Sequence, residues 1–261
     1  MQPAEAALEA RSLTVRFGGV LALDAVTLSI PSRHVVGVIG PNGAGKTTFF
    51  NAVCGFVRAD SGDVVSGGRS LAGVRPDQLH ELGISRTLQG LGLWPGLTVL
   101  ENVMAGARHQ GRTGFAAAVL GLPSADRDEA RIRASAMTVL ADLGVERFAQ
   151  AYPRALPYGV QKWVVMARAL VSEPTLLLLD EPASGLNEGE IEGLVGKLRE
   201  WSQRMTIALV EHRLDLVMGA CDLVHVLDFG RLIASGSPAE VSANPAVTTA
   251  HLGEELTPAN A

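Results

Sequence analysis

The sequence contains little cysteine, little lysine and no long apolar run. Its two cysteines, Cys54 and Cys221, have no metal-ligand spacing and do not suggest a disulfide framework. Cys54 lies in an apolar stretch, so we expect a buried, unreactive thiol, which fits a reducing cytoplasm. No apolar stretch approaches the roughly 20 residues that a membrane-spanning helix needs. Any association with a membrane would therefore go through a partner.

Basic charge and targeting signals are also sparse. The 261 residues carry a formal net charge of -5, with a pI near 5.7. A nucleic-acid surface needs a basic face, so we expect no nucleic-acid partner. Residues 1–9 are acidic and lack the basic and apolar regions of a signal peptide, so no signal peptide is expected.

One segment carries most of the functional information. Residues 40–47 read Gly-Pro-Asn-Gly-Ala-Gly-Lys-Thr, and they lie between the apolar run Val35–Ile39 and a helix-like stretch. This is the pattern G-x-x-x-x-G-K-[ST] of a phosphate-binding loop in its strand–loop–helix setting. The glycines let backbone N–H groups turn toward an anion, and the helix dipole adds positive potential. We expect Lys46 to bind the outer phosphates of a nucleoside triphosphate and Thr47 to ligate Mg²⁺.

The order of the predicted elements favours an α/β fold. Beyond residue 170, strands expected at 175–180, 206–210, 223–228 and 232–235 alternate with helices, as in a parallel sheet. The sequence predicts a P-loop NTPase with a RecA-like parallel sheet, an N-terminal antiparallel β subdomain and an inserted helical subdomain. The expected ranges are 11–88 and 171–253 for the nucleotide-binding core, 89–170 for the helical subdomain, and 1–10 and 254–261 for flexible tails.

Two carboxylates, Asp180 and Glu181, follow a predicted buried strand. They would lie at the carboxyl edge of the sheet, where nucleotide phosphates bind. Asp180 is placed to hold Mg²⁺, and Glu181 to orient and deprotonate an attacking water. His212 ends the next predicted strand at the same edge, so we expect it near the terminal phosphate.

Two further features leave alternatives open. Gln89 follows a strand-like run and could contact Mg²⁺ and water while acting as a hinge, although the sequence alone does not decide this. The segment Leu156-Pro-Tyr-Gly-Val160 opens a helix, and Gly159 could present N–H groups to an anion there. A helix that merely begins at a proline explains the same residues nearly as well.

These motifs, in this order and spacing, resemble the ATP-binding cassette (ABC) ATPases from about Leu13 to Gly253. The resemblance implies that ATP is the nucleotide, and no N-K-x-D segment for reading guanine is present. It implies catalytic roles for Lys46, Gln89, Glu181 and His212, and Mg²⁺ ligation by Thr47, Gln89 and Asp180. The implied ATP-binding residues are Phe17 (stacking on adenine), Asn42, Gly43, Ala44, Gly45, Lys46, Thr47 and Thr48, with Pro157, Tyr158 and Gly159 of the signature acting on a second chain's nucleotide.

Within that family, the segments at 15–24, 98–103, 210–217 and 250–254 look like the branched-chain amino-acid importer subgroup, which includes urea and amide transporters. A less close cousin is the lipopolysaccharide-export ATPase. The resemblance implies a peripheral ATPase on the cytoplasmic face of the cell membrane. Its implied partners are a second ABC ATPase, transmembrane permease subunits and, indirectly, an extracytoplasmic solute-binding protein.

The signature departs from the usual L-S-G-G-Q of this family. Pro157 replaces the serine whose hydroxyl would reach the γ-phosphate across the dimer, and it has no backbone N–H. Loss of one charge-assisted hydrogen bond would weaken closure by roughly one or two powers of ten. Since the phosphate-loop side is intact, we expect a heterodimer rather than a homodimer. The alternatives are a non-transport cassette that uses dimerisation as a regulatory clamp, and a subunit that hydrolyses ATP poorly.

Overall fold

The computed structural model describes residues 6–107 and 123–247. By its internal contacts the chain divides into two compact units. Unit 1 comprises Met1–Leu82 and Leu178–Ala261, and unit 2 comprises Gly83–Leu177. The predicted tail at 254–261 lies outside the described residues.

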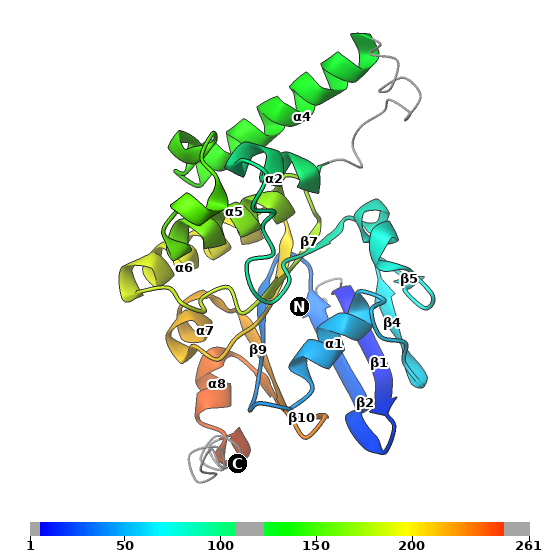
Figure 1. The fold of residues 1–261 in the computed structure, drawn as a ribbon. Helices are drawn as coiled ribbons and strands as arrows, with labels where there is room; N and C mark the ends of the chain where they lie inside the picture. Colours follow the sequence, from blue (N-terminus) through cyan, green and yellow to red (C-terminus); the bar gives the residue numbers. More distant parts are fainter. Residues whose placement is uncertain (1–5, 108–122, 248–261) are drawn as a thin grey trace. The chain divides into compact units, whose positions relative to one another are not determined.

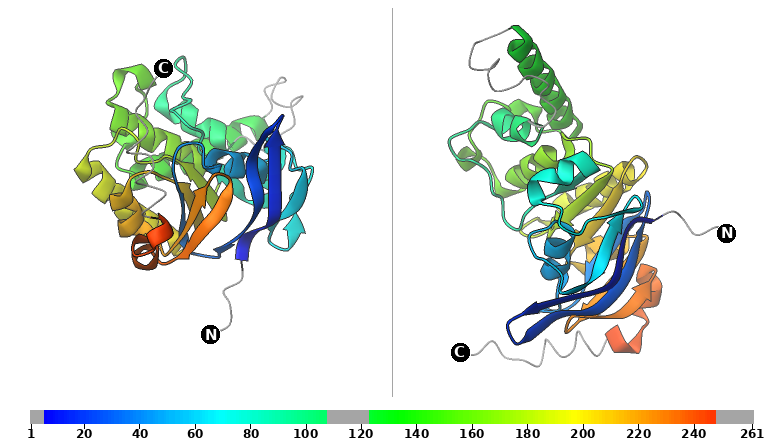
Figure 2. Two further views of the ribbon diagram at one scale, coloured as in Figure 1. Left: turned by 90° about the horizontal axis from the view of Figure 1, so that it is seen from below. Right: turned by 90° about the vertical axis from the view of Figure 1, so that its right-hand side faces the viewer.

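Unit 1 contains a four-stranded antiparallel sheet in the order β2-β1-β4-β5 (Figure 1). Its strands are β1 (Ala6–Phe17), β2 (Val20–Pro31), β4 (Ser61–Ser66) and β5 (Arg69–Ser70). The two long strands β1 and β2 lie side by side in both views of Figure 2. The flexible tail expected over residues 1–10 is therefore too long, because Ala6–Ala10 already pair with β2 and β4.

The parallel sheet of unit 1 is built around β3 (Val35–Ile39), which pairs in parallel with β8 (Thr206–Val210) and β9 (Leu223–Asp228). The strands follow the order β10-β9-β3-β8-β7, with β7 at Leu176–Asp180, of which Leu178–Asp180 belong to unit 1. The edge strand β10 (Arg231–Gly236) pairs antiparallel with β9, so the sheet is mixed with a parallel centre. Every residue of β3, β7 and β8 is buried, as expected for near-continuous apolar strands in such a sheet. The predicted strands at 206–210 and 223–228 are confirmed.

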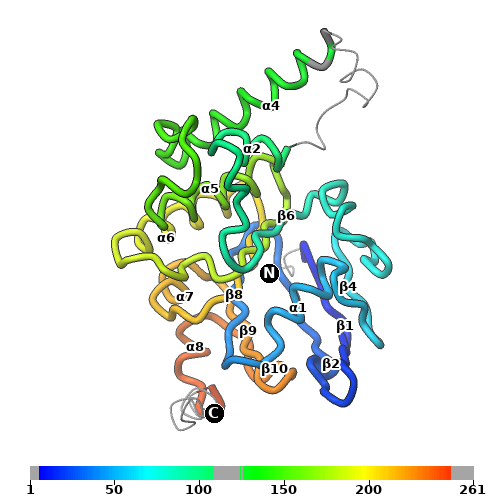
Figure 3. The backbone as a smooth tube through the Cα atoms, in the orientation of Figure 1, coloured from blue at the N-terminus to red at the C-terminus, as the bar shows by residue number. Residues whose placement is uncertain are grey.

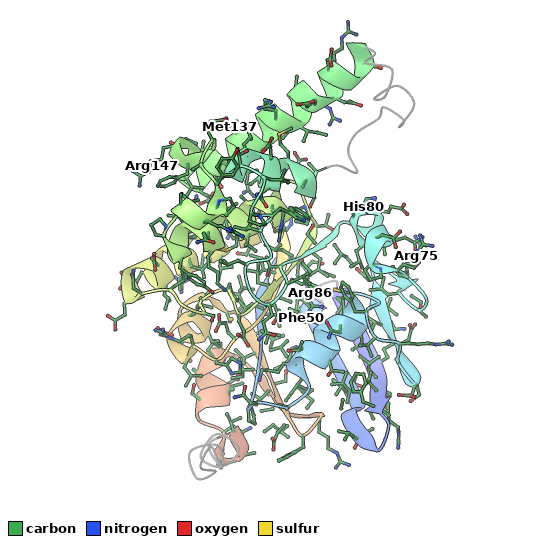
Figure 4. The ribbon with its side chains drawn as sticks, viewed as in Figure 1. Phe50, Arg75, His80, Arg86, Met137 and Arg147 are labelled. Carbon is green, nitrogen blue, oxygen red and sulfur yellow. The ribbon has the colours of Figure 1, made fainter. Side chains whose placement is uncertain are left out.

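The helices of unit 1 are α1 (Lys46–Val53), α6 (Glu188–Ser202), α7 (Leu214–Ala220) and α8 (Pro238–Ser242), with a 3-10 segment at Pro76–Leu82. The tube in Figure 3 can be followed from α1 through β4 to this segment. Phe50, labelled in Figure 4, is fully buried on α1, and its ring centroid lies 6.2 Å from that of Phe49. Helix α1, which follows the phosphate loop, is thus anchored in the core.

Unit 2 is mainly helical, with α2 (Val99–Gly106), α4 (Pro123–Asp142), α5 (Tyr158–Leu170) and the short strand β6 (Ile84–Arg86). Its core contains Val103, Leu140 and Val164, one from each helix, and Met137 packs against them (Figure 4). None of the helices in the described ranges is long and apolar enough to cross a membrane.

Candidate functional site

The phosphate loop joins β3 to α1. Its three glycines have positive φ angles, which are 142° at Gly40, 79° at Gly43 and 102° at Gly45. A Cβ on Gly40 would collide with the carbonyl oxygen of Leu227, and one on Gly45 would lie 2.6 Å from that of Ala22. No atom lies within 4 Å of the corresponding position at Gly43, where the loop is open. Glycine is therefore required for both the curl and the close packing of this loop.

Lys46 begins α1 and is only 6% exposed. Its Nζ donates hydrogen bonds to the carbonyl oxygens of Gly40, at 2.6 Å, and Pro41, at 2.7 Å. The ammonium group is therefore held over the loop instead of extending into solvent. Thr47 is exposed beside it, and the N-cap of α1, Gly45, makes no side-chain capping bond to the first turn. The start of this helix thus combines a fixed cation, a hydroxyl and the positive end of a dipole.

Phe17 ends β1, and its exposed fraction is 51%. The hairpin to which it belongs lies against the phosphate loop, because Gly45 approaches both Ala22 and Leu23 of β2. An exposed ring on this hairpin has the chemistry to stack on a nucleotide base. Its predicted role is therefore compatible with its position.

Asp180, Glu181 and His212 come together at the ends of two neighbouring strands. The backbone N–H of Glu181 donates to the carbonyl oxygen of Val210, at 2.9 Å. Val210 is in turn in register with Val38 of β3. The carboxyl ends of β7, β8 and β3 therefore meet at the sheet edge that carries the phosphate loop, as predicted for such a sheet.

Glu181 and His212 contact each other directly. The Oε1 atom of Glu181 lies 3.2 Å from Nε2 of His212, and both side chains are partly exposed. Asp180, by contrast, is only 3% exposed. Glu181 has a φ of 48°, in the left-handed region, which costs about 1–3 kcal/mol for a residue other than glycine. The hydrogen bond from its backbone N–H to Val210 helps to hold Glu181 in this backbone conformation.

Glu211 belongs to the same edge, although sequence reasoning gave it no role. It is 2% exposed, and its Oε1 accepts from the backbone N–H of Ala183 at 2.7 Å. Its Oε2 accepts from the N–H groups of His212, at 2.9 Å, and Arg213, at 3.2 Å. The signal in the sequence was a carboxylate at the end of an apolar strand.

Among the other phosphate-loop predictions, Asn42 is exposed, Ala44 buried and Thr48 half-buried. The predicted residues Gln89, Pro157, Tyr158 and Gly159 belong to unit 2. Gln89 is exposed in a bend after β6. Pro157 is the N-cap of α5, with φ -54° and ψ 149°, and it makes no side-chain capping bond. Tyr158 is 42% exposed, whereas Gly159 is buried. The exposed part of the signature is therefore Pro157 and Tyr158, and the roles of these residues remain predictions.

The pattern of a family described as ABC transporter matches residues 23–184, which is more than half of the chain. The chain belongs to the ABC transporter family. A second pattern, described as branched-chain amino acid ATP-binding cassette transporter, matches residues 231–257 of this ABC subunit.

Known proteins resemble the ABC subunit along nearly its whole length. The high-affinity branched-chain amino acid transport ATP-binding protein LivG of Salmonella typhimurium is 38% identical, covering 95% of this chain and 98% of LivG. BraF of Pseudomonas aeruginosa, with the same description, is 36% identical over the same shares. A crystal structure of the ADP conformation of MJ1267, an ATP-binding cassette of an ABC transporter, superposes with a TM-score of 0.83 at 28% identity, covering 96% of this chain and all of MJ1267.

Membership of this family confirms the predicted P-loop NTPase fold and the predicted activity. The chain is an ATP-binding subunit that hydrolyses ATP to power a membrane transporter, and its partners include membrane permease subunits. The relatives named above are transport proteins, and nothing in them favours the regulatory clamp.

Proposed function

We propose that this ABC subunit powers the import of branched-chain amino acids or of a related small polar solute. The observation that supports this cargo is the match of residues 231–257 to the branched-chain amino acid pattern, together with the full-length similarity to LivG and BraF. In this proposal the chain acts at the cytoplasmic face of the membrane. An extracytoplasmic solute-binding protein delivers the solute to the permease.

The phosphate-loop edge supplies the groups that ATP hydrolysis needs. ATP binds with its phosphates over residues 40–45, near the cation of Lys46. The site fits Mg²⁺, because the hydroxyl of Thr47 and the carboxylate of Asp180 are hard oxygen ligands. Mg²⁺ held by these residues would neutralise charge on the phosphates. Glu181 accepts a proton from the attacking water, and His212 orients that carboxylate through their 3.2 Å contact.

We define the docking segment as residues 88–97 of unit 2. It exposes three apolar side chains, since Leu88 is 51%, Trp94 49% and Leu97 36% exposed. Apolar side chains gathered on one exposed segment are typical of a protein contact site. The partner that we infer for the segment is an apolar cytoplasmic part of the permease.

The docking segment is held in place by one buried and one half-buried polar side chain. Asn102, fully buried on α2, accepts from the N–H of Trp94 and donates to the carbonyl oxygens of Trp94 and Leu97. Arg168 donates to the carbonyl oxygen of Gly92 at 2.7 Å, and its guanidinium lies 5.1 Å from the Trp94 ring centroid. Burial lowers the pKa of Arg168. A segment ordered in this way loses little further entropy on docking.

Transport by proteoliposomes tests the cargo and the docking segment together. The vesicles would contain this chain, a second cassette and its permease subunits, with the solute-binding protein supplied on the side opposite to ATP. We expect ATP-dependent uptake of leucine that isoleucine and valine inhibit.

Trp94→Ala should lower uptake and permease co-purification roughly tenfold, because it removes an exposed aromatic anchor, while ATP binding by the free chain is unchanged. Tyr152→Ala, a control on an aromatic with 54% exposure in the same unit, should change neither. Full uptake by Trp94→Ala would show that the docking segment does not contact the permease. Transport of other solutes alone would exclude branched-chain amino acids as the cargo.

We further infer that the chain forms a heterodimer with a second cassette. Pro157 provides neither a hydroxyl nor an N–H to a nucleotide on a facing chain. The chain's own phosphate loop, Glu181 and His212 lie together at one sheet edge. A partner with a complete signature would therefore close the site on this chain.

Pro157→Ser tests this asymmetry. Serine suits an N-cap, so the fold of α5 should be preserved. We expect low ATPase activity from the purified chain, and an increase of roughly tenfold in the variant, because a hydroxyl and an N–H become available across a homodimer. Pro245→Ser, which changes an exposed proline outside the signature and the docking segment, is the matched control. High activity of the unmodified chain, rising steeply with its concentration, would show that the homodimer is competent.

A further inference from the structure

Glu211 is a buried carboxylate between the two segments that carry Glu181 and His212. It lies after the last residue of β8, and only 2% of its surface is exposed. Its two oxygens face in different directions. One accepts from Ala183, two residues after Glu181, and the other accepts from His212 and Arg213.

These contacts extend the pairing of β7 and β8 beyond the ends of the strands. Between the backbones, the last link is the hydrogen bond from Glu181 N–H to the carbonyl oxygen of Val210. The next link, to Ala183, is made by the side chain of Glu211. The chain after β7 is thereby fixed on both sides of Glu181, where φ is 48°. Three N–H donors replace the water that this buried carboxyl group has lost.

We propose that Glu211 is a positioning residue that sets the 3.2 Å contact between Glu181 and His212. Its carboxylate accepts from the backbone N–H of Ala183, two residues after Glu181 in the chain, and from that of His212. The ring of His212 contacts Glu181 instead of Glu211. Glu211 thus acts through other residues and touches no reacting atom. The proposal rests on the catalytic roles proposed for Glu181 and His212.

Two variants separate position from chemistry. In Glu211→Gln, the amide NH₂ group must face a backbone N–H on one side, so one of the two links is lost with the shape kept. In Glu211→Asp, the charge remains but the shorter side chain cannot span both segments. We expect both to lower kcat for ATP hydrolysis roughly ten- to a hundredfold, with KM for ATP changed less than about threefold. Amide hydrogen exchange at Ala183 and His212 should become faster.

The controls distinguish a failure of the positioning role of Glu211 from a failure of the catalytic roles proposed for Glu181 and His212. Glu192→Gln, which changes an exposed carboxylate on α6, should match the unmodified chain in kcat, KM and exchange. Glu181→Gln measured in parallel tests the catalytic assignment, and it should leave exchange at Ala183 slow. If Glu181→Gln lowers turnover but a folded Glu211 variant keeps full kcat, Glu211 has no positioning role. A fall in kcat of a Glu211 variant with unchanged amide hydrogen exchange at Ala183 and His212 would also contradict the positioning role. If Glu211→Gln does not fold, Glu211→Asp decides.

Discussion

Glu181→Gln should lower kcat for ATP hydrolysis by about 10²–10⁴-fold while ATP binding remains. Glutamine keeps the size of the side chain and can still contact Nε2 of His212, which lies 3.2 Å from Glu181 Oε1. It cannot take a proton from water. Because the phosphate loop and Asp180 are untouched, affinity for Mg-ATP should change little. With hydrolysis blocked, the closed ATP-bound dimer should also last longer.

The measurement is steady-state phosphate release together with an ATP-binding isotherm. Glu192→Gln is a matched control, because it makes the same chemical change at an exposed position on α6. Unchanged turnover in Glu181→Gln would contradict the assignment of Glu181 as general base. Turnover too low to measure in the unmodified chain, even with its partner cassette, would instead favour the subunit that hydrolyses ATP poorly.

The phosphate loop could be predicted because its requirements are local. Gly40, Gly43 and Gly45 adopt the positive φ angles that the motif implies, and Lys46 begins the helix after it. The buried strands were equally readable, since continuous apolar runs and their breaks fix where β7 and β8 end. The strand order then brings Glu181 and His212 to one edge without further information.

Long-range contacts determined what the sequence could not reveal. The role of Glu211 depends on the N–H of Ala183, 28 positions away in the chain. Residues 6–10 looked like a loose tail because their pairing with β2 and β4 depends on partners far along the chain. Asn102 gave no local signal either, although its side chain orders the docking segment. Glu211 and residues 6–10 thus find their hydrogen-bond partners far along the chain, whereas the partners of Asn102 lie four to eight positions away in a stretch without regular secondary structure or at the start of α2.

Lys46→Met should weaken ATP binding by roughly 10²–10³-fold. Among the described residues of the phosphate loop and α1, Lys46 is the only cation, and the substitution removes it. Methionine has a similar length but cannot donate to the carbonyl oxygens of Gly40 and Pro41. Two effects therefore add: the phosphates lose a charge-assisted contact, and the loop loses two hydrogen bonds that hold its curl. Calorimetric titration with Mg-ATP measures the first, and thermal unfolding without nucleotide measures the second.

Lys197→Met provides the comparison, because Lys197 lies on α6 and forms a surface ion pair with Glu200. Such pairs contribute little to stability, so this variant should bind ATP as the unmodified chain does. A folded Lys46→Met protein with unchanged affinity would show that the loop backbone and the α1 dipole suffice to hold the phosphates. Loss of binding in both variants would indicate a general effect of removing positive charge. Loss in Lys46→Met alone ties affinity to the position of the ammonium group, since both changes alter the net charge equally.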